Sequence, residues 1–161
     1  MHPFLALLSQ RLTYFDGGLG TALQAMGLEG GENPGNWNLT HPREVKSVHL
    51  GYLNAGSDLV AANTFAANPL HFPDNWETVL REGIRLAREA AAEAGHGYVA
   101  LDAGSVGRLI QPLGDLPFEE AVTLYRDMAL VAVDAGCDLL IAETMTDLRE
   151  IKAAVLGYRD A

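Results

Sequence analysis

Two stretches of the chain nearly repeat each other: AGSDLVAANT at residues 55–64 and AGCDLLIAET at residues 135–144. Six of the ten positions are identical, and the two copies lie eighty residues apart. Each copy has a glycine that can end a helix, followed by an uninterrupted apolar run, which is typical of a parallel strand buried on both faces. The copies differ near their ends, where Asn63 in the first is replaced by Glu143 in the second.

The rest of the chain alternates between short β-like runs and longer segments with helical spacing. We expect strands over residues 13–15, 58–65, 98–104 and 137–144. We expect helices over residues 20–26, from a cap at Thr40 to a stop at Gly56, and over 74–94, 117–135 and 147–158. Strand and helix repeated four times predict an α/β fold with a parallel sheet and right-handed crossovers.

Such a sheet is either open and doubly wound or part of a (β/α)₈ TIM barrel. Alternate strands of a barrel supply side chains to the same interior layers, so related sequences suit the second and fourth strands. A barrel needs about 250 residues and eight strands. The 161 residues, with no linker or low-complexity tract, therefore predict one domain over residues 1–161 with four βα units, which is half the number in a barrel.

Polar residues follow each predicted strand at its carboxyl end, where parallel α/β proteins bind their ligands. The four groups are Asp16-Gly17-Gly18, Asn63-Thr64, the segment from Asp102 to Ser105, and Glu143-Thr144. Because carboxyl ends of parallel strands meet at one edge, we expect these groups to form a single binding face.

Each group also has a structural explanation. Asp16 and Glu143 could cap the helices that follow them, and Asn63 and Thr64 could bind loop backbone. Two carboxylates on one rim are harder to explain structurally, because like charges at a partly buried site are costly without a cation between them. An ammonium group of a ligand or a metal ion would supply that cation.

The composition excludes several classes of function. A formal net charge of −10 argues against nucleic acid or an anionic membrane surface as the partner. A single cysteine, Cys137, allows no internal disulfide, and no apolar run is long enough to span a bilayer. The first residues read as a helix and not as a signal peptide, so the cytoplasm is the expected location.

Three other features favour structural roles, and a fourth, Trp37, fits either of two roles. GGLG at residues 17–20 lacks the spacing and the lysine of a nucleotide loop, so we interpret it as a tight turn beside a ligand. The five histidines show no spacing typical of zinc ligands. Cys137 begins a buried strand and is expected to be a small core residue. Trp37, in the long first loop, fits either a lid over a pocket or a cover for the barrel edge.

Four ordered segments resemble the homocysteine S-methyltransferase family, which includes betaine–homocysteine methyltransferases and the homocysteine-binding module of cobalamin-dependent methionine synthase. They are DGGLGTALQ (16–24), NWNLTHPREVKSVHLGYLNAGSDLVAANTFAAN (36–68), GSVGR (104–108) and AGCDLLIAETMTDLREIKAA (135–154). The resemblance runs from about residue 12 to the end of the sequence.

The resemblance implies a (β/α)₈ barrel in which cysteine-bound zinc holds the homocysteine sulfur as a thiolate that attacks a methyl donor. It implies that Asp16 and Glu143 contact the amino-acid end of homocysteine. The backbone at Gly17 and Gly18 and the side chains of Asn63 and Thr64 would line the same pocket.

Two departures from the family pattern qualify this expectation. The zinc-binding cysteines of the family follow the sixth and eighth strands, and no residue of this sequence matches them. Arg108 stands where the family commonly has proline, which leaves the conformation of that loop open. The sequence therefore carries the part of the site that recognises the ligand and lacks the part that holds the metal.

Two classes of function follow. The chain is either the N-terminal half of a homocysteine methyltransferase, inactive alone, or a non-catalytic half-barrel that binds an amino acid or assembles with a partner. An independent open-sheet binding protein is a third, weaker reading. Half a barrel leaves two sheet edges unpaired, which predicts a homodimer or a complementary C-terminal half. The sequence does not distinguish S-methylmethionine, betaine or a methylated corrinoid as methyl donor.

Overall fold

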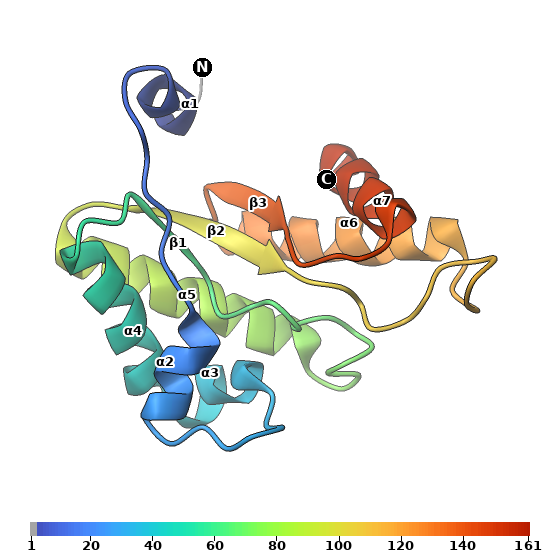
Figure 1. Cartoon of the computed structure of the whole chain (residues 1–161), viewed down its shortest axis with the longest axis horizontal. Coiled ribbons are helices and arrows are strands. Elements are labelled where there is room, and N and C mark those ends of the chain that lie inside the picture. The colour runs from blue at the N-terminus through green and yellow to red at the C-terminus, as the bar shows by residue number, and fades with distance from the viewer. Residues whose placement is uncertain (1–2) are drawn as a thin grey trace.

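A computed structural model of the chain, which describes residues 3–161, shows helices and parallel strands in alternation (Figure 1). In chain order the elements are α1 (Pro3–Leu8), α2 (Leu19–Ala25), the 3₁₀ helix η1 (Pro34–Asn36), α3 (Trp37–Thr40), α4 (Pro42–Asn54), β1 (Leu59–Ala61), α5 (Trp76–Ala94), β2 (Tyr98–Ala103), α6 (Phe118–Asp134), β3 (Leu139–Ala142) and α7 (Leu148–Asp160).

The sheet has three parallel strands in the order β1-β2-β3 within the described residues, where four strands were expected. The predicted first strand, residues 13–15, is extended chain that runs beside β1. The Asp58 amide donates to the Tyr14 carbonyl at 2.8 Å, but the return bond runs from the Tyr14 amide to the Asp58 carboxylate. The segment is therefore joined to β1 largely through side chains, and it does not form a regular ladder.

The aspartate shared by the two repeats has the same role in both copies. Asp138 donates its amide to the Val99 carbonyl at 2.7 Å and accepts from the Val99 amide at 2.8 Å through Oδ2. Asp58 makes the equivalent pair of bonds with Tyr14. Each aspartate thus joins its own strand to the preceding extended segment at the strand's entry. The architectural part of the repeat is explained by this pairing.

The repeated glycine also has one role. Gly56 and Gly136 follow α4 and α6 with φ values of 106° and 88°, a left-handed conformation that glycine adopts without a Cβ clash. This confirms both as helix stops. At the other end of α4 the predicted cap is wrong, because His41 precedes the helix and the Thr40 hydroxyl donates instead to the Asn36 carbonyl.

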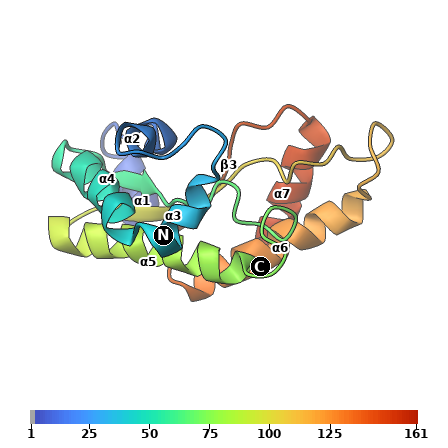
Figure 2. The same cartoon turned by 90° about the horizontal axis from the view of Figure 1, so that it is seen from below.

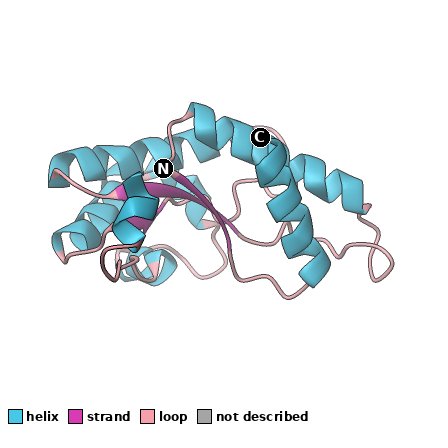
Figure 3. Cartoon of the chain, turned by 90° about the horizontal axis from the view of Figure 1, so that it is seen from above, coloured by secondary structure: helices cyan, strands magenta, loops and turns pink. Residues whose placement is uncertain are grey.

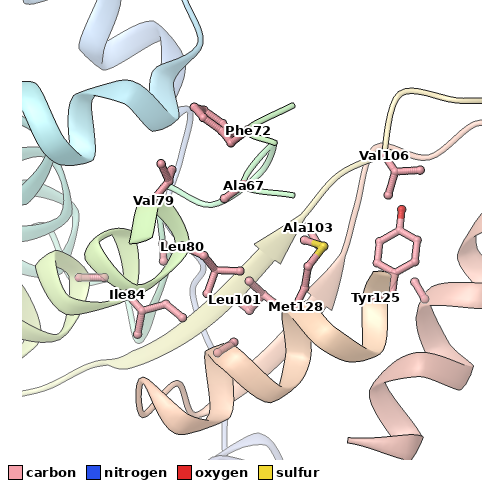
Figure 4. Packing of buried hydrophobic residues seen from close by; sticks show 14 of the residues in the cluster. Ala67, Phe72, Val79, Leu80, Ile84, Leu101, Ala103, Val106, Tyr125 and Met128 are labelled. Atoms are coloured by element: carbon pink, nitrogen blue, oxygen red, sulfur yellow. The ribbon is translucent and has the colours of Figure 1, made fainter. Parts of the chain in front are cut away.

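The two faces of the sheet have different coverings. Side chains of α5 and α6 pack on one face, where Leu80 and Met128 gather around Leu101 of β2 (Figure 4). Figure 2 shows α5 and α6 following one another along one side of the molecule, with α2 on the opposite side. This face supplies the main hydrophobic core, which includes Val60 and Ala103.

Figure 3 draws the strands in magenta. Their second face carries every other residue of each strand. At the amino-terminal ends, Phe4 of α1 packs against Leu59 and Ala100. Towards the carboxyl ends this face presents Asp102, paired in register with Ile141. An acidic residue at this point marks where the apolar face gives way to a pocket. Within residues 3–161 we find no helix long and apolar enough to cross a membrane.

Candidate binding site

A pocket of about 610 Å³ opens at the carboxyl ends of the three strands. Its wall comes from residues 15–20, residues 33–35, residues 61–63 and 65–66 at and after the end of β1, and the ends of β2 and β3. The last two contribute Asp102, Ile141 and Glu143. The pocket therefore gathers residues from five separate parts of the chain at the edge that the strand pattern predicts.

Asp16 is fixed against β1. Its Oδ2 accepts a hydrogen bond from the Ala61 amide at 3.0 Å, so the carboxylate takes the place of a carbonyl of a neighbouring strand. Burial raises the pKa of Asp16 to about 6; the bond from Ala61 opposes this rise and the negative charge of Glu143 adds to it. The side chain is thus anchored through one oxygen and sits in a pocket that disfavours its charge.

Asp102 is the most buried acid of the pocket. It is 9% exposed, and its Oδ1 has no hydrogen-bond partner. Its pKa is raised to about 7, first by burial and then by the charges of Glu143 and Asp16. The sequence pattern placed Asp102 at a strand end without assigning it to the ligand. The sequence signal that could have identified Asp102 is an acidic residue within the otherwise apolar strand YVALDA.

Glu143 is exposed at the end of β3, on the rim of the same pocket. Thr144 follows it with φ of 54°, a left-handed conformation that is rare for a β-branched residue. Strained backbone of this kind clusters at binding sites, where the surrounding structure has to hold it. The turn directs the chain out of β3 immediately after the carboxylate.

Gly17 and Gly18 lie in the pocket wall, beside Asp16. A Cβ added to Gly17 would come within 2.9 Å of the Tyr52 hydroxyl, so a side chain here would need Tyr52 to move. The Tyr52 hydroxyl is 3.3 Å from the Gly18 carbonyl, to which it donates. The glycines let backbone form this part of the wall.

Asn63 lines the pocket, but its amide group is used within the protein. Its Nδ2 donates at 2.8 Å to both the Pro34 carbonyl and Asn38 Oδ1, which ties η1 and the start of α3 to the end of β1. Asn38 in turn donates to the Asn63 carbonyl at 2.8 Å. Asn63 therefore supports the wall by holding another part of it in place.

Thr64 is fully buried and lies behind the wall. Its hydroxyl donates to the Asp102 carbonyl at 2.8 Å and lies 3.0 Å from the Asp102 amide, from which it accepts. This pair of bonds connects β1 and β2 directly beneath Asp102. Thr64 thus contacts the backbone of a pocket residue and not the pocket itself.

A buried carboxylate joins the first turn of α7 to the loop that follows β2. Glu150, 4% exposed in the first turn of α7, accepts from the Ser105 hydroxyl at 3.0 Å and the Val106 amide at 2.8 Å. The Tyr125 hydroxyl also lies 3.0 Å from the same oxygen, Oε1. Sequence reasoning missed Glu150, whose position in a helical turn resembles that of any surface glutamate.

Other residues considered from the sequence lie away from the pocket. Trp37 is buried in a small cluster with Leu23 and Val45, so it is neither a lid nor an edge cover. Cys137 packs partly buried against the main core at the amino-terminal side of β3, and burial raises the pKa of its thiol.

The described residues do not fit a metal centre. Within residues 3–161, no three His, Cys, Asp or Glu side chains are grouped closely enough to hold an ion. Zinc prefers thiolate and imidazole ligands, and the only thiol lies at the far end of β3 from the pocket. What the three pocket acids can do chemically is accept hydrogen bonds from a cationic group, for which an ammonium, with three N–H donors, is suited.

Comparison with known proteins identifies a family and several similar proteins. Residues 13–160 match the family model described as homocysteine S-methyltransferase. The chain is 34% identical over 174 aligned residues to methionine synthase of Mycobacterium tuberculosis, and 33% identical over 173 to that of Mycobacterium leprae. Each alignment covers 98% of this chain and 14% of the relative, so the chain spans a small part of those proteins.

The structure is similar to that of the homocysteine methyltransferase MmuM from Escherichia coli in its metallated form. The TM-score is 0.79 with 25% sequence identity, over 99% of this chain and 64% of that one. The similarity therefore extends along this whole chain and leaves about a third of the solved structure without a counterpart.

Proposed function

The chain belongs to the homocysteine S-methyltransferase family, and on that premise we propose that it forms the part of a methyl-transfer site that recognises homocysteine. The observation that carries the proposal is that Asp16 and Glu143, far apart in sequence, line one pocket at the carboxyl ends of the strands. The whole reaction would transfer a methyl group to the thiol of homocysteine and give methionine.

In this proposal Asp16 and Glu143 accept hydrogen bonds from the ammonium group of homocysteine. Like charges that share a partly buried site are stabilised by a cation between them. Burial is the main cause of the raised pKa of Asp16, and the charge of Glu143 raises it further. Gly17 and Gly18 contribute only backbone atoms to the pocket wall, which lets the ligand approach the main chain there. Asn63 and Thr64 hold the wall behind the ligand.

The family depends on zinc, which keeps the sulfur of homocysteine in its thiolate form at neutral pH. The described residues do not fit as its ligands, so no chemical step is assigned to this chain. We place the zinc ligands in a complementary C-terminal half, which is either the remainder of a longer protein or a separate chain. The domain over residues 1–161 is then the N-terminal half of a (β/α)₈ barrel working in the cytoplasm.

The sheet edge supports association with such a partner. β3 is the last strand of the sheet within the described residues, and all four of its residues are only partly buried. An apolar edge strand is a template for pairing with another strand. A second copy could close the barrel by the same edge, giving a homodimer of half-barrels.

This edge also favours a second candidate, a non-catalytic half-barrel that binds an amino acid or assembles with a partner. The two candidates differ in what the partner supplies. A homodimer brings only a second Cys137, whereas a complementary half would bring the thiolates of a zinc site. Zinc-dependent methyl transfer to homocysteine on adding a candidate C-terminal half supports the first candidate; binding without transfer supports the second.

Calorimetric titration of the chain with L-homocysteine tests the proposed recognition. We expect Glu143→Gln to weaken binding about ten- to a hundredfold, because hydrogen bonds to charged groups contribute about 1.5–3 kcal/mol. Glu119→Gln, an equal change of charge on the exposed first turn of α6, serves as the matched control and should bind as the wild type does. Equal affinity of all three proteins would contradict the proposal.

A further inference from the structure

Asp102 has a feature that the proposed recognition by Asp16 and Glu143 does not use. Its Oδ1 is buried, has no hydrogen-bond partner, and belongs to a residue that lines the pocket. Buried polar atoms are nearly always paired in folded proteins, and an unpaired acceptor at a binding site indicates a donor that the ligand brings. The group that completes this pairing has to be small enough to reach the inner end of the pocket.

The surroundings of Asp102 determine the charge of that donor. The titratable groups that act on it are Asp16 and Glu143 from the pocket wall, both acidic, while Tyr158 of α7 lies close enough for its own pKa to be raised by Asp102. Its backbone neighbours, Ile141 in register and Thr64 beneath it, carry no charge. A cation is therefore attracted to this point, and an anion is repelled.

We propose that Asp102 is the third acceptor for the ammonium group of the ligand, and that ammonium binding expels a proton from Asp102 to solvent. The inference rests on the proposed function and names an additional residue of the same site. An ammonium group has three N–H donors, and Asp16, Asp102 and Glu143 offer one carboxylate for each. The acid Asp102–COOH becomes Asp102–COO⁻ beside R–NH₃⁺, and one proton passes to the buffer.

The charges of the pocket residues support this exchange. With a pKa of about 7, Asp102 is about half protonated at neutral pH. A bound cation favours the ionised form, so the pKa falls on binding and the proton is released. Asp16, with a pKa of about 6, is already mostly ionised at pH 7 and therefore releases a smaller fraction of a proton on binding.

Calorimetry of L-homocysteine binding in two buffers of different ionisation enthalpy measures the protons released. At pH 7 we expect the wild-type chain to release about half a proton per ligand, and affinity to rise between pH 6 and 8. Asp102→Asn, which cannot ionise, should release far fewer protons, bind about tenfold more weakly at pH 8 and lose most of the rise in affinity between pH 7 and 8. Asp74→Asn, an exposed acid outside the pocket, is the matched control.

A second ligand, which has no amino group, tests the contribution of the ammonium group by itself. 4-Mercaptobutanoate, which lacks the amino group, should bind wild type and Asp102→Asn alike and release no proton. If Asp102→Asn retains wild-type homocysteine affinity and proton release, the role of Asp102 is overturned and the proposed function stands. If the wild-type chain binds no homocysteine, the proposed function fails and this inference fails with it.

Discussion

Glu150 Oε1 accepts a hydrogen bond from the Val106 amide at 2.8 Å and thereby joins the beginning of α7 to the loop after β2. That loop follows Asp102, and the segment before α7 begins with Glu143, so one buried carboxylate connects the regions that carry two acids of the pocket. The Tyr125 hydroxyl, directed towards the same loop in Figure 4, lies 3.0 Å from this oxygen. The site is thus supported from within the core.

Removing this carboxylate should cost stability. We expect Glu150→Ala to lower the free energy of unfolding by about 2–3 kcal/mol, because the buried Val106 amide and the Ser105 hydroxyl lose their acceptor. The Tyr125 hydroxyl keeps only the Gly104 carbonyl. Glu150→Gln keeps an acceptor oxygen and should cost clearly less. Urea unfolding followed by circular dichroism measures both, and an Ala variant as stable as the Gln variant would contradict the supporting role.

The aspartate of the repeat provides a second test. Asp138→Ala leaves the buried Val99 amide without its acceptor, and we expect a loss of about 1–3 kcal/mol in unfolding free energy. Asp138→Asn retains an acceptor oxygen at the same point and is the matched control. If the two variants unfold at the same urea concentration, the side-chain oxygen does not contribute to strand pairing.

His49 should make the chain sensitive to acid. It is fully buried in α4, neither ring nitrogen has a hydrogen-bond partner, and burial lowers its pKa to about 4. The unfolded chain binds a proton near pH 6.5 and the folded chain does not, so the contribution of His49 to stability is lost as the pH falls from 6.5 towards 4.

We therefore expect His49→Leu to be more stable than the wild type at pH 5, with a smaller difference at pH 7.5. Thermal unfolding at the two pH values measures this difference. His96→Gln, a change at an exposed histidine, controls for the loss of a titrating group. A wild type that matches His49→Leu at both pH values would show that the buried ring is tolerated in its charged form.

Stability depends on the ionisation of Asp102 in the opposite direction, falling as the pH rises. Its folded pKa of about 7 lies above the usual value near 4, so the folded chain holds a proton that the unfolded chain releases. The contribution of protonated Asp102 to the free energy of unfolding is present at pH 4 and is lost as the pH rises through 7. Asp102→Asn should thus be more stable than the wild type at pH 8 in the absence of ligand, measured by urea unfolding. A variant less stable at pH 8 would show that ionised Asp102 is stabilised in the empty pocket.

Several elements could be predicted from the sequence because their signals are local. Gly56 and Gly136 ended their helices as expected, and the apolar runs gave β1, β2 and β3 close to their observed positions. The strand-end rule likewise brought Asp16 and Glu143 to one pocket. These signals depend on backbone conformation and hydrophobic periodicity, which short windows of sequence carry.

The remaining features depend on contacts between distant segments. Residues 13–15 have the composition of a strand, but their pairing with β1 uses the side chain of Asp58, which no local pattern reveals. Thr64 and Asp102 follow the same strand-end rule, yet one bonds to backbone and the other faces the pocket. The role of Glu150 depends on the contact between α7 and the loop after β2, which are far apart in the sequence.

The structure of the chain bound to L-homocysteine, determined by crystallography near neutral pH, tests the central claim most directly. We predict the ligand nitrogen among the carboxylates of Asp16, Asp102 and Glu143, at hydrogen-bonding distances of about 2.7–3.0 Å. The sulfur should point away from these acids. A ligand bound with its own carboxylate next to Asp102, or one that leaves the pocket empty and binds elsewhere, would contradict the account.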